Sequence, residues 1–367
     1  MRPFEFRLPT KIVFGRGRIT EIGAHIPAAI ERVFIVTDGT IASRTPALDT
    51  ILRSLPGRDV RIFDRVEENP SIATVEEAGG EARAFRAELV IGLGGGSPMD
   101  AAKGVALLAA DGRPLARFLA GMPVERSPLP VIAVPTTSGT GSEVTPYAVF
   151  TDRNAGNKIG YGNDGLFPAL ALIDPELTYS MPPAVTVNTG LDVLAHAVEA
   201  YLSTLSFPLN DALALQAVDV VLAHLGRAAL GDRESMDQMS AAAAAAGAAI
   251  AHGSTILPHI MGYPLTVFHG VPHGRASAIM LVHVLAGLTA GSACPEKIEL
   301  INARFVGHGG PEGFLRSLGV SVKLADYGVR EENLAAYARK TIVKGDAKIT
   351  PAAVTVEWIE SLYRSAL

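Results

Sequence analysis

The sequence predicts a two-part fold, an α/β domain over residues 1–178 followed by an all-α domain over residues 179–367. Short β-rich runs alternate with helix-like segments in the first half, an order typical of a parallel sheet covered by helices. After about residue 180 the chain becomes rich in Ala and Leu at helical spacing and shows few strand signals. Hydrophobic residues make up 48% of the 367 residues, which is ample apolar material for a core in each part.

Individual elements follow from local patterns in the chain. The opening stretch "FEFRLPTKIVFG" predicts two strands around Pro9 and Thr10, and the stretch 71–87 predicts a helix. Further strands are expected at 32–38, 59–64, 87–97 and 129–137. Helical patterns then continue to the end of the chain, as in 332–343 and 352–367.

Charge and cysteine content argue against several classes of protein. The formal net charge is −5, the isoelectric point is near 6.0 and no long basic run is present, which disfavours nucleic acid or an anionic membrane as the partner. The single cysteine, Cys294, excludes an intrachain disulfide and a cysteine-based zinc site. The N-terminal stretch lacks the apolar core of a signal peptide, and the apolar run 241–251 is too short to span a bilayer. We therefore expect a cytoplasmic protein.

The stretch "VIGLGGGSPMDAAK" predicts a strand-to-helix turn that suits a phosphate. The strand should end at Gly92, and Gly94–Gly96 then allow tight turning and close approach of a ligand. Ser97 is a good N-cap, Pro98 suits the first helical position, and Asp100 falls in the first turn. The N–H groups of such a helix start favour a pyrophosphate. A plain turn is the alternative, because the usual dinucleotide fingerprint has a third glycine where Ser97 stands.

Two further polar features follow predicted strands. Asp38 ends "VFIVTD", where a carboxylate can accept a hydrogen bond from a ribose 2′-hydroxyl and would repel a 2′-phosphate. An ordinary turn aspartate before Gly39 is the alternative. The loop "PTTSGTGSEVTP" over 135–146 is crowded with hydroxyls and glycines, so it either binds a ribose or phosphate or is a flexible surface loop.

Asp192 and His196 lie four residues apart in "GLDVLAHAVEAY", on a predicted helix. That spacing places both side chains on one face, where they can share a divalent metal or form a helix-surface ion pair. The neighbouring residues are apolar, which predicts a buried helix, and a buried aspartate is costly unless something positive meets it. The sequence therefore favours a metal over a surface pair.

Histidines gather in "LPHIMGYPLTVFHGVPHG", residues 257–274, which holds His259, His269 and His273 out of 9 in the chain. Two of these histidines, together with Asp192 and His196, can supply a donor set of one Asp and three His. Such a set suits Fe²⁺, Zn²⁺ or Mn²⁺, and ligand type alone does not choose among them. His252 is a further candidate, two helical turns before His259.

Together these motifs resemble the iron-containing (group III) alcohol dehydrogenase family, over essentially the whole chain. Those that carry the resemblance are "VTDGT" (36–40), "EENP" (67–70), "GGGSPMDAAK" (94–103), "PTTSGTGSEVT" (135–145), "MPPAVTVNTGLDVLAHAVEAY" (181–201) and "FHGVPHGRASAIML" (268–281). The resemblance implies a Rossmann-like N-terminal domain, a helical C-terminal domain and an active site in the cleft between them. It also implies an enzyme that reduces aldehydes or ketones, or oxidises alcohols, with NAD(P)(H).

The resemblance also implies roles for individual residues. The metal ligands would be Asp192, His196, His259 and His273, with Fe²⁺ as the expected ion and Zn²⁺ or Mn²⁺ as alternatives. The cofactor-binding residues would be Asp38, Asn69, Gly95, Gly96, Ser97, Asp100, Thr136, Thr137 and Lys158. Asp38 matches the position associated with a preference for NAD over NADP. Family members often dimerise or form larger assemblies, so a homodimer or larger homo-oligomer acting on a small alcohol or aldehyde is expected.

Two positions depart from the family pattern. Many members carry a histidine four residues after the third ligand, where this chain has Tyr263. Its hydroxyl would replace the imidazole or only shape the pocket. Tyr263 and His269, a further pocket residue, are the candidate catalytic residues. Pro258 stands directly before His259, where it is expected to bend or interrupt the helix.

Three other interpretations are open. A maleylacetate reductase-like enzyme works without a metal, and the full set of four ligands argues against it. A zinc polyol dehydrogenase of the glycerol type is disfavoured by "GGGSPMD" and by the fourth ligand. A non-catalytic nucleotide- or metal-binding relative would bind NADH without turnover. No residue set in the sequence identifies the substrate.

Overall fold

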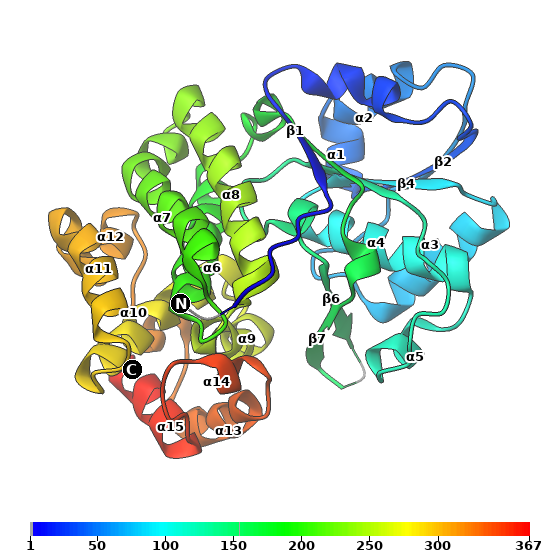
Figure 1. Cartoon of the computed structure of the whole chain (residues 1–367). Helices are drawn as coiled ribbons and strands as arrows, with labels where there is room; N and C mark the ends of the chain where they lie inside the picture. The colour runs from blue at the N-terminus through cyan, green and yellow to red at the C-terminus, as the bar shows by residue number, and fades with distance from the viewer. Residues whose placement is uncertain (1–2, 154) are drawn as a thin grey trace. The chain divides into compact units, whose positions relative to one another are not determined.

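The computed structural model describes residues 3–153 and 155–367, which form two compact units (Figure 1). The α/β unit is Arg7–Ser180, and the helical unit is Met181–Leu367 together with the described residues up to Phe6. The N-terminal segment contacts the helical unit through Phe4, which stacks on Phe207 with 4.5 Å between ring centroids. The expected architecture, a parallel sheet with flanking helices followed by an all-α part, is confirmed. The domain limits 1–178 and 179–367 stay a prediction.

Six parallel strands form the sheet of the α/β unit, in the order β1-β8-β5-β4-β2-β3. They are β1 Lys11–Phe14, β2 Arg32–Val36, β3 Asp59–Phe63, β4 Leu89–Gly94, β5 Val131–Pro135 and β8 Leu170–Ile173. The chain runs outward from β2 to β3, returns to β4 on the other side of β2, and continues away through β5. This change of direction makes the carboxyl ends of β2 and β4 a topological switch point, the usual ligand site of open parallel sheets.

Alternation along β2 divides its side chains between two cores. Val33 and Ile35 belong to the core that includes the 3₁₀ helix η1 and α2, whereas Phe34 and Val36 belong to the core that includes α3 and α4. A period of two is what an extended strand imposes when both faces of its sheet are covered. The covering elements are η1 Arg18–His25, α1 Gly39–Arg44, α2 Ala47–Arg53, α3 Ile72–Ala84, α4 Gly96–Asp111 and α5 Leu115–Leu119.

The sequence predictions missed three strands and included one strand that the described residues do not form. β8 was missed, and so was the antiparallel hairpin of β6 Tyr147–Asp152 and β7 Asn157–Gly162. The prediction of two strands around Pro9 and Thr10 is wrong, because the described residues before Lys11 form no strand. Phe6 stacks instead on His252, with 4.4 Å between ring centroids, so this segment packs against helices rather than pairing with a sheet.

Ten α-helices are described in the helical unit. They are α6 Pro183–Leu202, α7 Pro208–Ala229, α8 Arg233–Gly253, α9 Leu257–His269, α10 His273–Ala290, α11 Pro295–Phe305, α12 Gly310–Ser317, α13 Glu331–Ile342, α14 Asp346–Ile349 and α15 Val356–Ser365. α6, α7 and α8 pack against one another, and α10 packs against both α6 and α9 (Figure 1). The alanine tract of α8 is almost wholly buried, and its small side chains permit this close approach. α6 is thus held on several sides, and its second half is buried.

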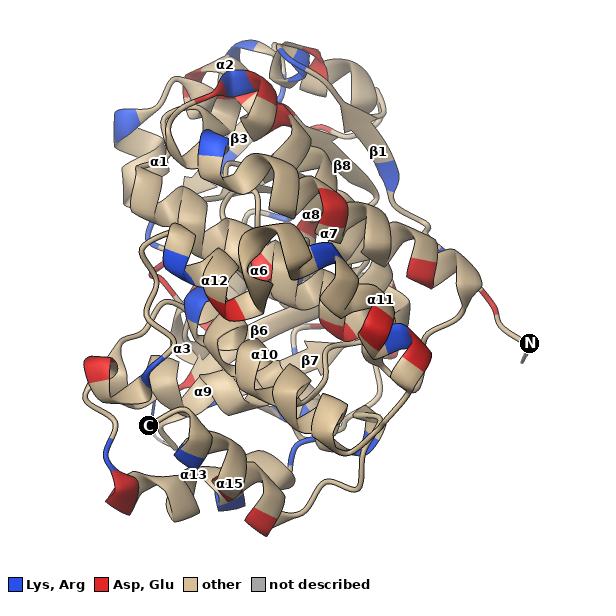
Figure 2. Cartoon of the chain, turned by 90° about the vertical axis from the view of Figure 1, so that its left-hand side faces the viewer, with Lys and Arg blue, Asp and Glu red and all other residues tan. Residues whose placement is uncertain are grey.

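Among the described residues, α7 is long and apolar enough to cross a membrane, and α8 and α9 meet the same criteria of length and hydropathy only together, as a pair bent by 111°. α7 packs against α6 and α8 and carries Asp211, Asp219 and Arg227, which is consistent with a bundle helix. Charges of both signs are interspersed on outer helices such as α11 (Figure 2).

Candidate metal and nucleotide sites

Three side chains from two helices of the helical unit form a buried group that can hold a metal ion. Asp192 and His196 lie one turn apart on α6, and His259 lies in the first turn of α9. Each offers one ligand atom, and these atoms all lie within 4.8 Å of one another. The face that carries the Asp192 and His196 pair is therefore turned to the core, where α9 supplies the third donor.

His273, the first residue of α10, brings a fourth donor to the same carboxylate oxygen. Its Nε2 lies 3.8 Å from Oδ1 of Asp192. The Nε2 atoms of His196 and His259 lie 4.0 Å and 3.5 Å from that same oxygen. The fold thus brings together the four residues that the sequence named as ligands, with one carboxylate oxygen facing three imidazole nitrogens.

The electrostatics of this group favour a bound cation. Burial raises the pKa of Asp192, but the three histidines outweigh burial and hold that pKa below its ordinary value. Among the described residues, neither Asp192 Oδ1 nor His259 Nε2 has a hydrogen-bond partner, although both atoms are buried. Buried polar atoms left in this state are costly unless something satisfies them. A divalent first-row metal, which takes carboxylate oxygen and neutral imidazole nitrogen, fits these donors.

Gly274 lets α10 approach α6 closely enough for His273 to reach the group. A Cβ at Gly274 would lie 2.2 Å from the backbone oxygen of Asn188 and 2.6 Å from Cβ of Asp192. No side chain fits at such distances, so the glycine is required by packing and not by its backbone angles. The sequence carried no signal for this role, because it depends on which helix faces the residue.

Tyr263 and His269 occupy different surroundings on α9. The Tyr263 ring lies one turn beyond His259, with its centroid 5.9 Å from that of His273, and burial raises its pKa above the ordinary tyrosine value. His269 ends the helix, ten residues and therefore about 15 Å beyond His259. Its Nε2 forms a 2.7 Å hydrogen bond with the hydroxyl of Tyr337 on α13. Of the two candidate catalytic residues, Tyr263 is the one beside the metal-binding group.

His252 and Pro258, two other residues singled out in the sequence, also have defined places. His252 is stacked on Phe6 as described above. The break in the helix lies before Pro258, between the end of α8 and the start of α9, where Ser254 has a φ of 58°. Pro258 itself lies inside the first turn of α9, so it does not interrupt that helix.

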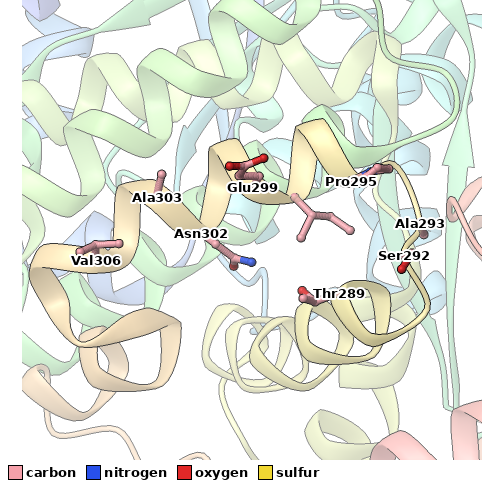
Figure 3. Close-up of a pocket in the computed structure, with 9 residues that line it drawn as sticks. Thr289, Ser292, Ala293, Pro295, Glu299, Asn302, Ala303 and Val306 are labelled. Carbon is pink, nitrogen blue, oxygen red and sulfur yellow. The ribbon is translucent and has the colours of Figure 1, made fainter.

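A groove elsewhere in the helical unit is separate from the metal-binding group. It has a volume of about 460 Å³ and lies between the end of α10 and α11, with Thr289, Glu299 and Asn302 among the residues that line it (Figure 3). Thr289 lies sixteen residues along α10 from His273, about 24 Å of helix. The groove and the metal-binding group are therefore different features.

The α/β unit gathers its predicted nucleotide-binding residues at the carboxyl ends of β2, β4 and β5. Asp38 follows β2, Gly95–Ser97 follow β4, and Thr136 and Thr137 follow β5. Adjacent parallel strands place these ends side by side at the switch point. Thr137 Oγ1 is buried without a hydrogen-bond partner among the described residues, as is Oγ1 of Thr37 at the end of β2. Such hydroxyls fit a site that a polar ligand completes.

The glycine turn differs in detail from the sequence prediction. β4 continues to Gly94 instead of ending at Gly92, and α4 begins at Gly96 with Gly95 as its N-cap. Ser97 therefore is not the N-cap, and its hydroxyl accepts a hydrogen bond from the backbone N–H of Asn69. A Cβ at Gly96 would lie 2.6 Å from the side chain of Thr140. The α4 N-terminus has no side-chain cap, so its N–H groups can meet a phosphate.

Asp38 uses one carboxylate oxygen to start a helix. Its Oδ1 accepts hydrogen bonds from the backbone N–H groups of Thr40 and Ile41, at 2.9 and 3.0 Å, and so caps α1. Its Oδ2 faces the neighbouring strand, 3.4 Å from the point that a Cβ on Gly94 would occupy. Asp38 therefore acts as an ordinary turn aspartate, and its second carboxylate oxygen also lies beside the glycine turn.

Asn69 and Lys158 come together near the start of α4. Nζ of Lys158, on β7, donates to Oδ1 of Asn69 at 2.6 Å. The backbone oxygen of Asn69 accepts from the hydroxyl of Thr151 on β6, while its N–H donates to Ser97. The hairpin that the sequence missed is therefore the element that carries Lys158 to the predicted cofactor residues.

Asp100 lies in the second turn of α4, not in the first turn as predicted, and is partly buried. Its carboxylate accepts from the hydroxyl of Ser142 at 2.6 Å and from the N–H of Val149 at 2.8 Å. The buried Lys103 also donates to Ser142, at 2.8 Å, and to the backbone oxygen of Tyr147, at 2.6 Å. Asp100 and Lys103 thus fasten the polar loop and the hairpin to α4.

Comparisons with known proteins agree with this architecture. The family model for iron-containing alcohol dehydrogenase matches residues 9–175, and the model for the C-terminal part of the same family matches residues 186–367. The lactaldehyde reductase of Escherichia coli (strain K12) is 30% identical over 96% of this chain and 97% of its own length.

Solved structures give the same result. An iron-containing alcohol dehydrogenase from Thermotoga maritima matches with a TM-score of 0.93 and 39% identity, over 100% of this chain and 99% of the other. A sulfoacetaldehyde reductase from Bifidobacterium kashiwanohense, solved in complex with NAD⁺, matches with a TM-score of 0.92 and 29% identity over the same shares. The protein therefore belongs to the iron-containing alcohol dehydrogenase family and is an oxidoreductase of alcohols and aldehydes.

Proposed function

We propose that the protein is an NAD(H)-linked alcohol dehydrogenase or aldehyde reductase that depends on a divalent metal, with Fe²⁺ as the first choice and Zn²⁺ or Mn²⁺ as alternatives. The observation that carries the proposal is the single oxygen of Asp192 that faces three imidazole nitrogens, in a group where Asp192 Oδ1 and His259 Nε2 are buried without a hydrogen-bond partner among the described residues. Asp192, His196, His259 and His273 would hold the ion. A bound divalent cation supplies Lewis acidity toward the alcohol or carbonyl oxygen, and the nicotinamide supplies or accepts the hydride.

The α/β unit would bind the nucleotide through the residues at its switch point. Gly95, Gly96 and Ser97 would meet the pyrophosphate at the start of α4, with the hydroxyls of Thr136 and Thr137 beside it. Asn69 and Lys158 would contact the nucleotide as a hydrogen-bonded pair. Asp100 would contribute by fixing the polar loop. Asp38 would accept from the ribose hydroxyls and repel a 2′-phosphate, which favours NAD over NADP.

Tyr263 would face the substrate, in place of the histidine of many relatives. Its position beside His273 supports this role, and a phenol that keeps its proton can donate a hydrogen bond to a substrate oxygen. His269 was also a candidate, but its bond to Tyr337 supports a role in holding the end of α9 to α13. The substrate class is a small alcohol or aldehyde.

The decisive experiment combines metal analysis with activity. The protein purified without oxygen is assayed for bound Fe, Zn and Mn, and then screened against alcohols and aldehydes with NAD and NADP. His259→Ala and His273→Ala should lose both metal and turnover while the fold is retained. Turnover that survives in either variant after chelation would contradict the proposal and favour a metal-independent reductase. Binding of NADH without turnover across the panel would favour a non-catalytic relative.

We further propose that the protein is cytoplasmic and works as a homodimer or larger homo-oligomer, without nucleic acid or membrane as a partner. Assembly into dimers or larger oligomers is common in the family, and the net charge of −5 with no long basic run argues against nucleic acid or an anionic membrane. Light scattering coupled to gel filtration measures the mass of the assembly, and a monomer at micromolar concentration would contradict it.

A further inference from the structure

Glu199 is a fully buried carboxylate that the metal-binding group does not include. It lies on α6, three residues after His196 and seven after Asp192, among apolar residues such as Val198 and Leu202. Its side chain has an exposure of 0%. Burial of an ionised carboxylate costs several kcal/mol unless other groups satisfy its oxygens. The hydrogen-bond partners of the Glu199 carboxylate therefore indicate its role.

Both oxygens of Glu199 are directed at one residue and its helix start. Oε1 lies 2.5 Å from Nδ1 of His259. Oε2 accepts from the backbone N–H of Ile256 at 2.7 Å and from the backbone N–H of His259 at 3.4 Å. Glu199 therefore contacts His259 at its ring and at its backbone, which fixes both the position of the residue and the orientation of its imidazole.

This contact selects one tautomer of His259. A carboxylate at Nδ1 favours the proton on that nitrogen, so the lone pair is left on Nε2. Nε2 is the atom that points at the metal-binding group, 3.5 Å from Asp192 Oδ1, and it has no hydrogen-bond partner among the described residues. The tautomer that Glu199 favours is the one that can bind a cation at Nε2.

The start of α9 explains why a carboxylate, and not a cap on the helix itself, is used here. Ile256 is the N-cap, and its aliphatic side chain cannot accept from the first turn. Pro258 has no N–H to satisfy, and the N–H of Leu257 is bonded to Thr350 Oγ1 at 3.1 Å. The N–H groups of Ile256 and His259 remain, and both donate hydrogen bonds to Glu199.

We propose that Glu199 is a positioning residue for the metal site: it presents Nε2 of His259 to the ion and thereby sets the affinity of the site. The inference rests on the proposed metal-dependent function. Partners of this kind typically change metal affinity by about 10- to 100-fold when they are removed. Glu199 does not touch substrate or cofactor in this scheme; it acts through His259.

The test is a titration with Co²⁺ of the whole protein from which metal has been removed by a chelator. Binding is monitored by the visible spectrum of Co²⁺, and the affinity is measured by competition with a chelator. Glu199→Gln should weaken Co²⁺ binding by about 10- to 100-fold and alter the spectrum. A glutamine oxygen turned to Nδ1 leaves its NH₂ against two backbone N–H groups, and the flipped amide donates to Nδ1 and moves the proton to Nε2. Both orientations therefore impair the site.

Thr350→Val is the matched control, because it removes the acceptor for Leu257 N–H at the same helix start without touching His259. It should lower the melting temperature of the apoprotein but leave Co²⁺ affinity unchanged. If Glu199→Gln does not fold, Glu199→Asp replaces it, since a side chain shorter by one methylene cannot reach both Nδ1 and the backbone N–H groups.

The outcomes separate this inference from the proposed function. Wild-type affinity in the folded Glu199 variant overturns the positioning role while the metal site stands. An equal loss of affinity in Thr350→Val also overturns it, because helix capping would then be the cause. If the wild type binds no Co²⁺ and His259→Ala behaves identically, the metal site itself is wrong, and the inference falls with it.

Discussion

Replacing Gly274 by alanine tests whether the contact between α6 and α10 sets the metal site. The added Cβ would lie 2.2 Å from the backbone oxygen of Asn188, against about 3.4 Å for ordinary contact. The obstacle is backbone within α6, so α10 must move away by about 1.2 Å. His273 begins α10 and would move with it. Metal sites tolerate about 0.2 Å of change in ligand distance, so a shift of this size removes His273 from the donor set.

The expected loss of stability can be estimated. Overpacking of this kind costs about 1–3 kcal/mol, and the better helix propensity of alanine returns up to ~1 kcal/mol. We expect a net loss of up to about 2 kcal/mol in the free energy of unfolding of the apoprotein. Metal affinity should also fall by roughly tenfold or more, as for other disturbances of ligand support.

The assay pairs denaturant unfolding of the apoprotein with Co²⁺ titration. Gly291→Ala, at the end of the same helix, is the control, because its nearest contacts are 3.4 Å and longer and its φ of −79° suits alanine. It should change neither quantity by much. Wild-type stability and wild-type metal affinity in Gly274→Ala would refute the argument that backbone packing positions His273.

Three further predictions concern other parts of the molecule. Asp38→Ser keeps an acceptor for the α1 cap but removes the charge, so the ratio of kcat/KM for NADP to that for NAD should rise by about tenfold, roughly 1.4 kcal/mol; an unchanged ratio would contradict the role of Asp38. His269→Ala should cost about 1 kcal/mol of stability by loss of the bond to Tyr337 and leave Co²⁺ affinity unchanged, so a weakened metal site would show that His269 acts there. Burial raises the pKa of Glu143 to about 7, whereas the same group in the unfolded chain has a pKa of about 4.5. Between these pH values the folded protein keeps a proton that the unfolded chain has released. The free energy of unfolding should therefore fall as the pH rises from about 4.5 to about 7. Glu143→Gln should flatten this part of the stability profile and gain on the order of 2–3 kcal/mol at pH 8, as denaturant curves from pH 4 to 8 can check.

The parts of the fold that the sequence predicted well are those specified by local pattern. β2 and β4 are continuous apolar runs, as expected for strands buried on both faces, and their predicted positions agree closely with the structure. The hairpin β6–β7 was missed because its strands mix polar, glycine and apolar residues and are stabilised by pairing with each other. The stretch before Lys11 alternates like a strand, but its aromatic rings pack on helices instead.

In the candidate sites too, residues placed by local pattern were predicted and residues placed by helix packing were not. Asp192 and His196 are four residues apart, so helix geometry alone brings them together. Glu199 and Gly274 gain their roles only from α9 and α10, and no local pattern reports which helices will meet. An ionisable residue within the apolar run of α6 was the one available signal for Glu199. Ser97 was misplaced as the N-cap because the helix begins two residues earlier than the Ser-Pro pair suggests.

The hydrogen bonds of Asp100 and Lys103 have a consequence for cofactor affinity. They join the first half of α4, the polar loop and the hairpin that carries Lys158. Segments fixed in this way are ordered when the chain folds, so a nucleotide that arrives later need not restrain them. Such preorganisation lowers the entropic cost of association, and it allows a few hydrogen bonds and one helix N-terminus to hold a large cofactor.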